Sequence, residues 1–364
     1  MTASGPKDGY PVTPGPDEKG SQRLSLERLH RWESLGYGMF IHFGMSTYVD
    51  VSRQVNFKPS GNDPATCYAP DKLDVDQWVC VARDAGMKYA VLTAKHISGF
   101  CLWPSRHTDY TVANSGNTTD VVAAFVESCR KRGVLPGLYY SSYDNHHRWG
   151  SRTRSDFPSR EAYMELFHKR PRFGGINSGR DDDDGRMPYA TAHFQTFQTA
   201  QVTELLAEYG PLVELWGDHP EVLGRGYRTY FYETMARIEP DMVILMNNGL
   251  PDSECYDIEY AWPADLMAIE RGQPPAGGYR KWRHIEGRTY YIPGEVCDSI
   301  APVKLDWFWL EGDRPRPFRE LLGQFRACKE GGANYLLNVP PDKHGRISEV
   351  FIQTLAELRK EMGV

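Results

Sequence analysis

Short apolar runs alternate along the chain with longer stretches in which apolar residues recur every three or four positions. The short runs predict buried strands, and the periodic stretches predict amphipathic helices. We predict eight strands, at residues 38–44, 88–95, 133–141, 211–218, 242–247, 256–260, 290–296 and 333–339. We predict seven helices, at residues 26–35, 73–85, 119–131, 194–209, 227–238, 318–329 and 348–361.

The alternation of strand and helix predicts an α/β fold, a (β/α)8 barrel of the TIM type, rather than an open doubly wound sheet. No glycine-rich phosphate fingerprint follows the first strand, which argues against a dinucleotide-binding fold. We expect one domain over residues 26–364, without a C-terminal β-sandwich. Residues 1–25 are rich in proline, glycine and charge and are predicted to be a flexible tail, and residues 143–193 form a long insertion.

Composition excludes several classes of function. The net charge of -6 gives no electrostatic case for binding nucleic acid or an anionic membrane. No apolar stretch approaches the roughly 18 residues that a membrane span requires. The first 25 residues lack the apolar core of a secretory signal. We therefore expect a cytoplasmic protein that acts on a small or oligomeric solute.

Two residue types refine this expectation. Aromatic residues make up 12% of the chain, with 9 Trp and 21 Tyr, and such rings pack well against the C–H faces of sugars. The seven cysteines include no C-x-x-C pair. This pattern is more typical of buried free thiols than of a disulfide framework or a zinc site.

The carboxyl ends of the strands of a parallel barrel meet at one face. The residues that we expect there are His42, Lys95, His96, Tyr139 or Tyr140, Trp216, Asp218, Asn247, Asn248, Glu259, Glu295 and Asn338. They would form a polar cup lined with rings. Glycoside hydrolysis needs one ionised carboxylate and a second carboxyl group, of raised pKa, that protonates the leaving oxygen.

Asp218 is the sharpest candidate, because it ends the apolar run 211–218. A carboxylate at the tip of a buried strand is costly unless it faces a polar cavity. We interpret Asp218 as the nucleophile of a retaining glycosidase and Trp216 as a wall of its sugar pocket. The alternative is an ordinary strand-end aspartate that caps the next turn. Lys95 and Asn338 likewise have a structural alternative, as salt-bridge or hydrogen-bond partners.

The sequence resembles the α-L-fucosidases of glycoside hydrolase family 29. The resemblance runs in family order over roughly residues 30–355 and rests on stretches 38–44, 88–96, 99–105, 137–141, 215–218 and 334–339. It implies a barrel and a retaining, double-displacement mechanism. The small β-sandwich that follows the barrel in this family has no counterpart among the predicted elements.

The resemblance also implies catalytic roles. Asp218 falls on the family's nucleophile, with Trp216 two residues before it as in the family's L-W-x-D. Three glutamates are candidates for the acid and base, whose position varies within the family. Glu259 lies in a context like the family's acidic loop, and Glu295 matches the glutamate of the W-E-x-C-x-S stretch, although glycine replaces the tryptophan. Glu270 is the third candidate.

Further residues are predicted to bind the substrate. The resemblance places His42 and His96 on histidines that contact sugar hydroxyls, and Tyr140 on a tyrosine of the pocket. Lys95 and Trp103 stand in the matched stretches and are also predicted to bind substrate. No metal ion and no cofactor is expected.

The chain departs from the family at groups that recognise the sugar. The family's K-H-H-D-G-F reads K-H-I-S-G-F here, so that Ile97 and Ser98 replace a histidine and an aspartate. The family's N-D-R-W reads N-N-G-L at residues 247–250, without its arginine. Because a site built for hydroxyl groups discriminates strongly, the substrate is either an α-L-fucoside or a glycoside of a related sugar.

Two other classes of function are weighed against this interpretation. A metal-dependent hydrolase would use His42, His96, Asp218 and histidines of the insertion as ligands, but no strand carries an H-x-H pair. A carbohydrate-binding barrel without catalysis is the other alternative. The sequence leaves assembly into a homo-oligomer open. It places the insertion over the active face, as a lid or a contact with a neighbouring subunit.

Overall fold

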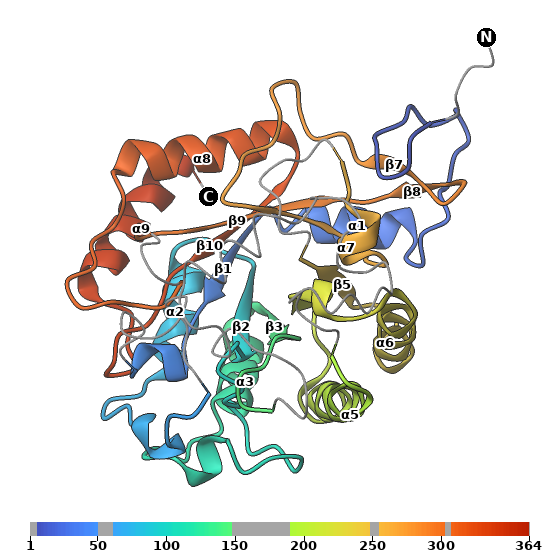
Figure 1. Ribbon diagram of the computed structural model, residues 1–364. Helices are drawn as coiled ribbons and strands as arrows, with labels where there is room; N and C mark the ends of the chain where they lie inside the picture. Colours follow the sequence, from blue (N-terminus) through green and yellow to red (C-terminus); the bar gives the residue numbers. More distant parts are fainter. Residues whose placement is uncertain (1–5, 50–60, 148–189, 248–254, 303–306, 364) are drawn as a thin grey trace, which may run out of the picture.

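The computed structural model describes residues 6–49, 61–147, 190–247, 255–302 and 307–363. It contains a barrel of eight parallel strands in the order β5-β4-β3-β2-β1-β10-β9-β6 (Figure 1). A parallel bridge between Leu245 and Leu266 joins the two end strands. The strands are β1 (Tyr37–Ile41), β2 (Tyr89–Lys95), β3 (Leu135–Ser141), β4 (Glu214–Asp218), β5 (Val243–Met246), β6 (Met267–Glu270), β9 (Gly294–Ser299) and β10 (Asn334–Asn338). The predicted barrel is confirmed.

Helices surround the barrel (Figure 1). They are α1 (Leu26–Glu33), α2 (Val75–Asp84), α3 (Val121–Arg132), α5 (Ala192–Tyr209), α6 (Arg225–Ile238), α7 (Ile258–Ala261), α8 (Phe318–Gly331) and α9 (Glu349–Met362). Local sequence sets their ends. Asp120 caps α3 by accepting a hydrogen bond from Ala123 N, and Gly133 follows the helix at a φ of 71°, a conformation in which glycine carries no steric penalty.

Alternation along the strands divides the apolar residues into two layers. Phe40, Tyr139, Trp216 and Leu336 belong to a cluster inside the barrel. Their strand neighbours belong to the larger cluster between barrel and helices, for example Leu138, Leu215 and Leu337. Successive residues of a strand therefore face opposite sides. Near the end of a strand, one residue faces the mouth of the barrel and the next faces the helices.

The predicted sixth and seventh strands are wrong in their boundaries. Residues 256–260 contain the start of helix α7, which Asp257 caps by accepting from Tyr260 N, and β6 forms the sixth barrel strand instead. Residues 290–296 divide at Pro293, whose ring nitrogen carries no hydrogen-bond donor. The earlier part belongs to β8 (Arg288–Tyr291), which pairs antiparallel with β7 (Trp282–Ile285), and the later part begins β9.

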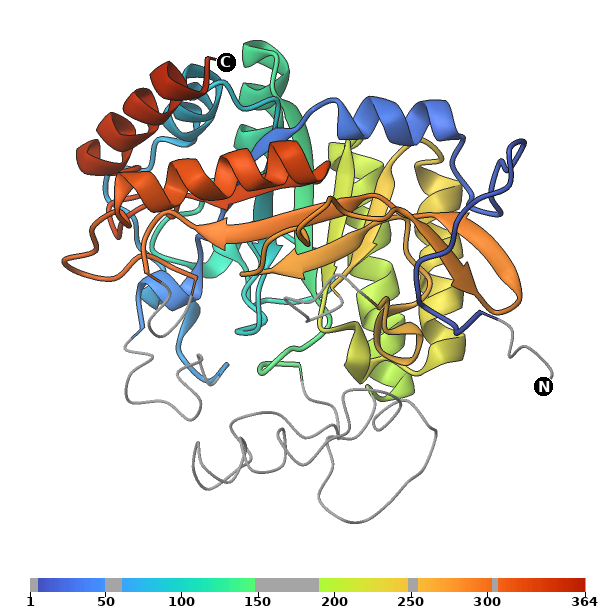
Figure 2. The ribbon, with the colours of Figure 1, turned by 90° about the horizontal axis from the view of Figure 1, so that it is seen from above.

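The described part of the predicted N-terminal tail lies along the β7–β8 hairpin (Figure 2). Gly9 N donates to His284 O at 2.7 Å, and Ser21 N donates to Thr289 O at 2.8 Å. Arg23 forms an ion pair with the buried Asp265. These backbone and charge contacts attach the described part of the segment to the domain, and the flexibility of the tail stays a prediction. Residues 1–5 lie outside the described residues.

Three other predictions concern the cysteines, membrane-spanning helices and the insertion. All seven cysteines are free, and five of them are buried, as the absence of paired spacing indicated. No helix among the described residues is both long and apolar enough to cross a bilayer. Most of the predicted insertion, residues 148–189, lies outside the described residues, so its role as a lid or subunit contact stays a prediction.

Candidate active site

Asp218 lies at the carboxyl end of β4, at the mouth of the barrel. Its side chain is only 12% exposed. The Oδ2 atom accepts a hydrogen bond from Tyr139 Oη at 2.5 Å, and the Oδ1 atom accepts from Asn247 Nδ2 and from the backbone nitrogen of His219, both at 2.9 Å. Three donors from three strand ends thus converge on one carboxylate, and Nε2 of the His219 ring lies 3.4 Å from Oδ2.

This environment keeps the carboxylate ionised. Burial by itself raises the pKa of Asp218, because it disfavours the charged form. The charge of His219, the hydrogen bonds from Tyr139 and Asn247, and the charge of His96 act in the opposite direction and lower its pKa to about 2. Asp218 is therefore a carboxylate over the whole neutral range, as a nucleophile must be.

Glu270 is the carboxylate that the structure places beside Asp218. It ends β6, and its Oε2 atom accepts from Asn247 Nδ2 at 3.0 Å, the nitrogen that also donates to Asp218. The two acceptor oxygens are consequently within about 6 Å of each other, which is compatible with the separation of about 5–5.5 Å between the carboxyl groups of retaining glycosidases. The described contacts of Glu270 are thus compatible with the geometry of a retaining glycosidase.

The backbone is strained directly after each of these two carboxylates. His219 follows Asp218 at a φ of 55°, and Arg271 follows Glu270 at a φ of 55°. A side chain other than glycine costs on the order of 1 kcal/mol or more in this region, and such residues gather at functional sites. Glu286, in the tip of the β7–β8 hairpin, is the other such residue that the described part of the chain contains.

Two histidines line the mouth near Asp218. His42 follows β1, and its Nδ1 donates to Asn338 Oδ1 at 2.9 Å, so Asn338 fixes the orientation of the ring. His96 follows β2 and stacks on Tyr139, with ring centroids 5.4 Å apart. Trp307 stacks on His42, with ring centroids 5.5 Å apart. These rings can receive a sugar through both C–H and hydroxyl contacts.

Trp216 and Glu295 lie deeper in the barrel. Trp216 stacks on Tyr139 and donates its indole N–H to Glu295 Oε1 at 3.0 Å. Glu295 is the second residue of β9, and it also accepts from Tyr89 Oη. We predicted Glu295 at the active face because the predicted seventh strand ended close behind it, at residue 296. The barrel strand begins at Gly294, so the structure places Glu295 at the amino end of β9, away from the mouth of the barrel.

Glu295 forms a carboxyl pair with Glu214, and both side chains are buried. Burial raises the pKa of Glu295 to about 7, although hydrogen bonds from Tyr89, Trp216 and Glu214 oppose the change. Burial and the neighbouring charge of Glu295 raise the pKa of Glu214 well above its usual value. The pair therefore holds at least one proton at neutral pH, like other carboxyl pairs in close contact.

This pair predicts a pH dependence of stability. An unfolded glutamate titrates near 4.3, whereas Glu295 titrates near 7 when folded, so the folded state binds more protons between these values. The stability contributed by Glu295 is full below the lower value and is lost as the pH rises through the higher one. We expect Tm to fall more between pH 5 and pH 8 in the wild type than in Glu295→Gln. Parallel curves for the two proteins would contradict a shared proton, and Glu357→Gln, on the exposed face of α9, is the control.

Glu259, the first candidate for the acid and base, lies on helix α7. Its side chain is outside the described part of the structure, so its role stays a prediction. The helix replaces the strand on which the sequence placed it. The backbone position of Glu259 is consequently not that of a strand-end residue.

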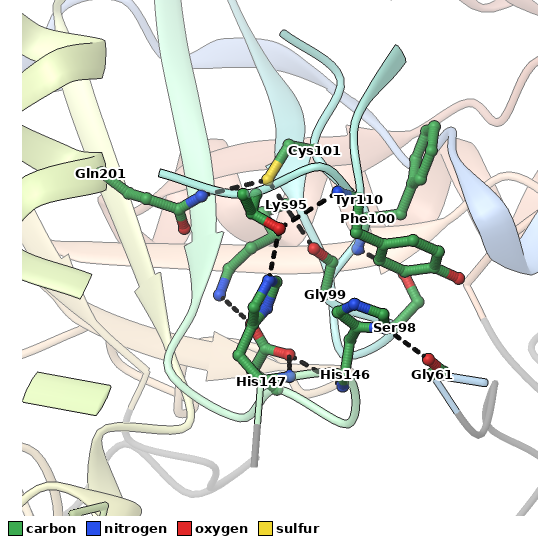
Figure 3. Close-up of polar contacts among 12 residues, drawn as sticks. Gly61, Lys95, Ser98, Gly99, Phe100, Cys101, Tyr110, His146, His147 and Gln201 are labelled. Atoms are coloured by element: carbon green, nitrogen blue, oxygen red, sulfur yellow. Dashed lines mark hydrogen bonds and ion pairs between the residues drawn. The ribbon is translucent and has the colours of Figure 1, made fainter. Parts of the chain in front are cut away.

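The structure does not bring Lys95, Tyr140 or Trp103 to Asp218. Lys95 (Figure 3) is buried, and its Nζ donates to Asp144 at 2.6 Å. The same Nζ lies 4.3 Å from the centroid of the Tyr140 ring. Tyr140 points toward the helices and donates to Gln201 on α5. Its neighbour Tyr139 faces the barrel interior, and successive side chains of a strand face opposite sides. Trp103 is fully buried and donates to a glutamate of α5.

The histidines considered as metal ligands are also dispersed. His146 contacts Gly61 O at 2.6 Å through Nδ1, and His147 contacts Asp144 at 2.8 Å (Figure 3). His193 is exposed on α5. Among the described residues, no three His, Cys, Asp or Glu side chains are grouped so that they could hold a metal ion.

Three residues of the site were not assigned a role from sequence. Tyr139 was named only as an alternative to Tyr140, and a correct strand register would have selected it. Trp307 lies in the connection after β9, and no periodicity marks it. His219 directly follows Asp218, the last residue of β4. This proximity in sequence was the feature that could have indicated a place in the site.

The sequence was compared with protein families and with known proteins. The α-L-fucosidase family model matches residues 14–363. "Alpha-L-fucosidase 1" of Arabidopsis thaliana is 30% identical over 359 residues, which cover 95% of this chain and 60% of that protein. "Plasma alpha-L-fucosidase" of Rattus norvegicus is 30% identical over 365 residues, covering 92% of this chain and 69% of that protein. The chain thus spans about 60% of the length of the Arabidopsis relative.

Solved structures are similar over nearly the whole chain. Alpha-L-fucosidase isoenzyme 1 from Paenibacillus thiaminolyticus has a TM-score of 0.69 and 26% identity, covering 93% of this chain and 75% of that one. Unliganded alpha-L-fucosidase AlfC from Lactobacillus casei has a TM-score of 0.65 and 21% identity, covering 93% of this chain and 98% of that one. At 21% identity, the similarity to AlfC supports the fold alone.

Proposed function

The chain belongs to the α-L-fucosidase family, and we propose that it is a retaining exo-glycosidase that hydrolyses terminal α-L-fucosides. In this proposal Asp218 is the nucleophile and Glu270 is the acid and base. The observation that carries the proposal is the shared donor Asn247, whose side-chain nitrogen bonds to both carboxylates. It holds them at a separation suited to double displacement rather than to direct attack by water, which requires about 6.5–9.5 Å.

The first step forms a covalent intermediate. Asp218 attacks the anomeric carbon, and the bond from that carbon to the leaving oxygen breaks as Glu270 donates its proton to the oxygen. The product is a glycosyl ester of Asp218 and a free alcohol. Tyr139 and Asn247 hold the carboxylate in place during the attack, which reduces the entropic cost of orienting it.

The second step regenerates the enzyme. Glu270, now ionised, removes a proton from water, and the water oxygen attacks the anomeric carbon as the bond to Asp218 breaks. Two inversions at one carbon give net retention of configuration. His42 and His96, held by Asn338 and by Tyr139, supply contacts for sugar hydroxyls in both steps.

The identity of the sugar is the least constrained part of the proposal. The relatives are named α-L-fucosidases, which supports a fucoside, whereas Ile97 and Ser98 replace two polar groups of the family pattern. Ile97 is buried in an apolar cluster with Tyr143 and Val222, so it offers no hydrogen bond to a hydroxyl. We therefore propose a fucosidase with fewer polar contacts to its sugar than the family pattern supplies.

A panel of aryl glycosides tests this function. We expect kcat/KM to be highest for the α-L-fucoside, compared with the α-L-galactoside, the β-D-galactoside and the α-L-rhamnoside. We also expect NMR to detect α-L-fucose as the first product, and a chelator to leave the rate unchanged. A different preferred sugar would replace the substrate but keep the mechanism. Binding without turnover of any glycoside would overturn the proposal.

The compartment can be inferred from the thiols. All seven cysteines are free, and such a set persists where thiols are kept reduced. We infer a reducing, cytoplasmic environment for this chain.

A further inference from the structure

His219, which follows Asp218, occupies an unusual backbone conformation. Its φ is 55° and its ψ is 46°, in the left-handed region that holds only about a few per cent of residues other than glycine. The imidazole side chain is therefore held there by its surroundings. Its ring is 16% exposed and packs against the ring of Tyr143 at 5.5 Å.

The ring of His219 lies between two carboxylates. Its Nδ1 is 2.9 Å from Glu221 Oε1, and its Nε2 is 3.4 Å from Asp218 Oδ2. Glu221 is buried, at 1% exposure, and a buried carboxylate requires a positive or strongly donating partner. The imidazole of His219 thus has an acceptor oxygen beside each nitrogen, and its charge lowers the pKa of Asp218.

Other groups also face Asp218, from every neighbouring strand. They are Tyr139 on β3, His96 after β2, Asn247 after β5, Glu270 on β6 and Cys297 on β9. His219 also contacts a buried carboxylate, that of Glu221, through its other ring nitrogen. In addition, burial opposes ionisation of Asp218, and the charge of His219 is the largest of the influences that lower its pKa.

We propose that Glu221 and His219 form a positioning pair that keeps Asp218 ionised and promotes its departure from the glycosyl-enzyme. This inference rests on the proposed function. Asp218 loses its negative charge when the ester forms and regains it when the ester breaks. A fixed cation beside it stabilises the ionised state, so it favours breakdown of the ester over its accumulation.

The inference predicts a specific kinetic pattern for His219→Asn. Asparagine tolerates the left-handed backbone, so the turn is preserved while the cation is lost. We expect kcat to fall by about 10-fold, with KM falling in parallel because the ester accumulates. We also expect the acid limb of the kcat/KM profile, which reports the ionisation of Asp218 in the free enzyme, to move up by roughly one pH unit.

Glu221→Gln is the second variant, and His284→Asn is the matched control. The glutamine keeps the shape of the buried side chain and removes only its charge. We therefore expect smaller decreases in kcat and KM and a smaller shift of the acid limb than in His219→Asn. His284 also pairs with a carboxylate, that of Asp8, and its side chain is 19% exposed, but it lies on β7. His284→Asn should leave both kinetic constants and the acid limb unchanged. If His219→Asn does not fold, His219→Gly, which fits the same φ, takes its place.

The outcomes separate this inference from the proposed function. A wild-type protein that hydrolyses none of the aryl glycosides would overturn the proposed function. An active wild type together with folded His219 and Glu221 variants whose acid limb does not move would overturn the positioning pair alone. A change confined to Tm, with kcat and KM unaltered, would assign His219 to the turn after β4 and would also overturn the inference.

Discussion

Asp218→Ala is expected to lose turnover by on the order of 10⁴-fold, because the carboxylate acts in both steps of double displacement. Azide should partly restore the reaction, since this small anion can enter the space of the missing carboxylate and attack the anomeric carbon. The product would be a glycosyl azide of inverted configuration. Measurement of kcat/KM on an aryl α-L-fucoside, with the azide product identified by NMR, tests this expectation.

The control for Asp218→Ala is Asp241→Ala. Asp241 is an exposed aspartate at the amino side of the barrel, before β5, and its removal should leave kcat/KM unchanged. An Asp218→Ala protein with the activity of the wild type would refute the nucleophile. A loss of activity without any effect of azide, in a folded protein, would favour a structural role for the carboxylate.

Glu270→Ala is expected to have the second largest effect, and the effect should depend on the leaving group. General acid catalysis contributes about 10²- to 10⁴-fold, and a good leaving group needs little protonation. We therefore expect a loss in that range for a natural α-L-fucoside and a much smaller loss in the formation of the ester from an activated aryl fucoside. Azide should accelerate the second step and give a product of retained configuration.

Comparison of three glutamate variants decides which residue is the acid and base. Glu270→Ala should show the dependence on the leaving group. Glu295→Gln should affect good and poor leaving groups equally, because Glu295 contacts Trp216 and Tyr89 at the amino end of β9. Glu259→Ala should resemble the wild type. The assignment fails if Glu259→Ala, and not Glu270→Ala, shows that dependence.

Errors of a few residues in strand boundaries explain the differences between the predicted and the observed site. Successive side chains of a strand face opposite sides, so register decides which residue reaches the mouth. Tyr139 rather than Tyr140 meets Asp218 for this reason. Likewise Pro293 ends one segment before β9 begins, which moves Glu295 from the end of a strand to its start and leaves Glu270 as the carboxylate at the mouth.

Pairing between residues far apart in the chain is a second reason why the predicted and the observed site differ. Lys95 is a charged residue at the end of a strand, and the sequence contains nothing that identifies its partner. The structure pairs it with Asp144, which lies three residues after β3 and also accepts from His147. A buried lysine is stable only with such a partner, and folding supplies it from a distant part of the chain.

The sequence by itself determined the barrel, its first five strands and its last, and the place of Asp218. Apolar periodicity, chain reversals and a polar end to an apolar strand are local properties. The sequence also contained the stretches on which membership of the family rests. Only the tertiary structure decided which carboxylate lies beside Asp218, which histidine has a carboxylate on each side, and which conspicuous polar residues are buried in the scaffold. Those outcomes depend on strand register and on contacts between residues far apart in the chain, and neither is encoded in a local pattern.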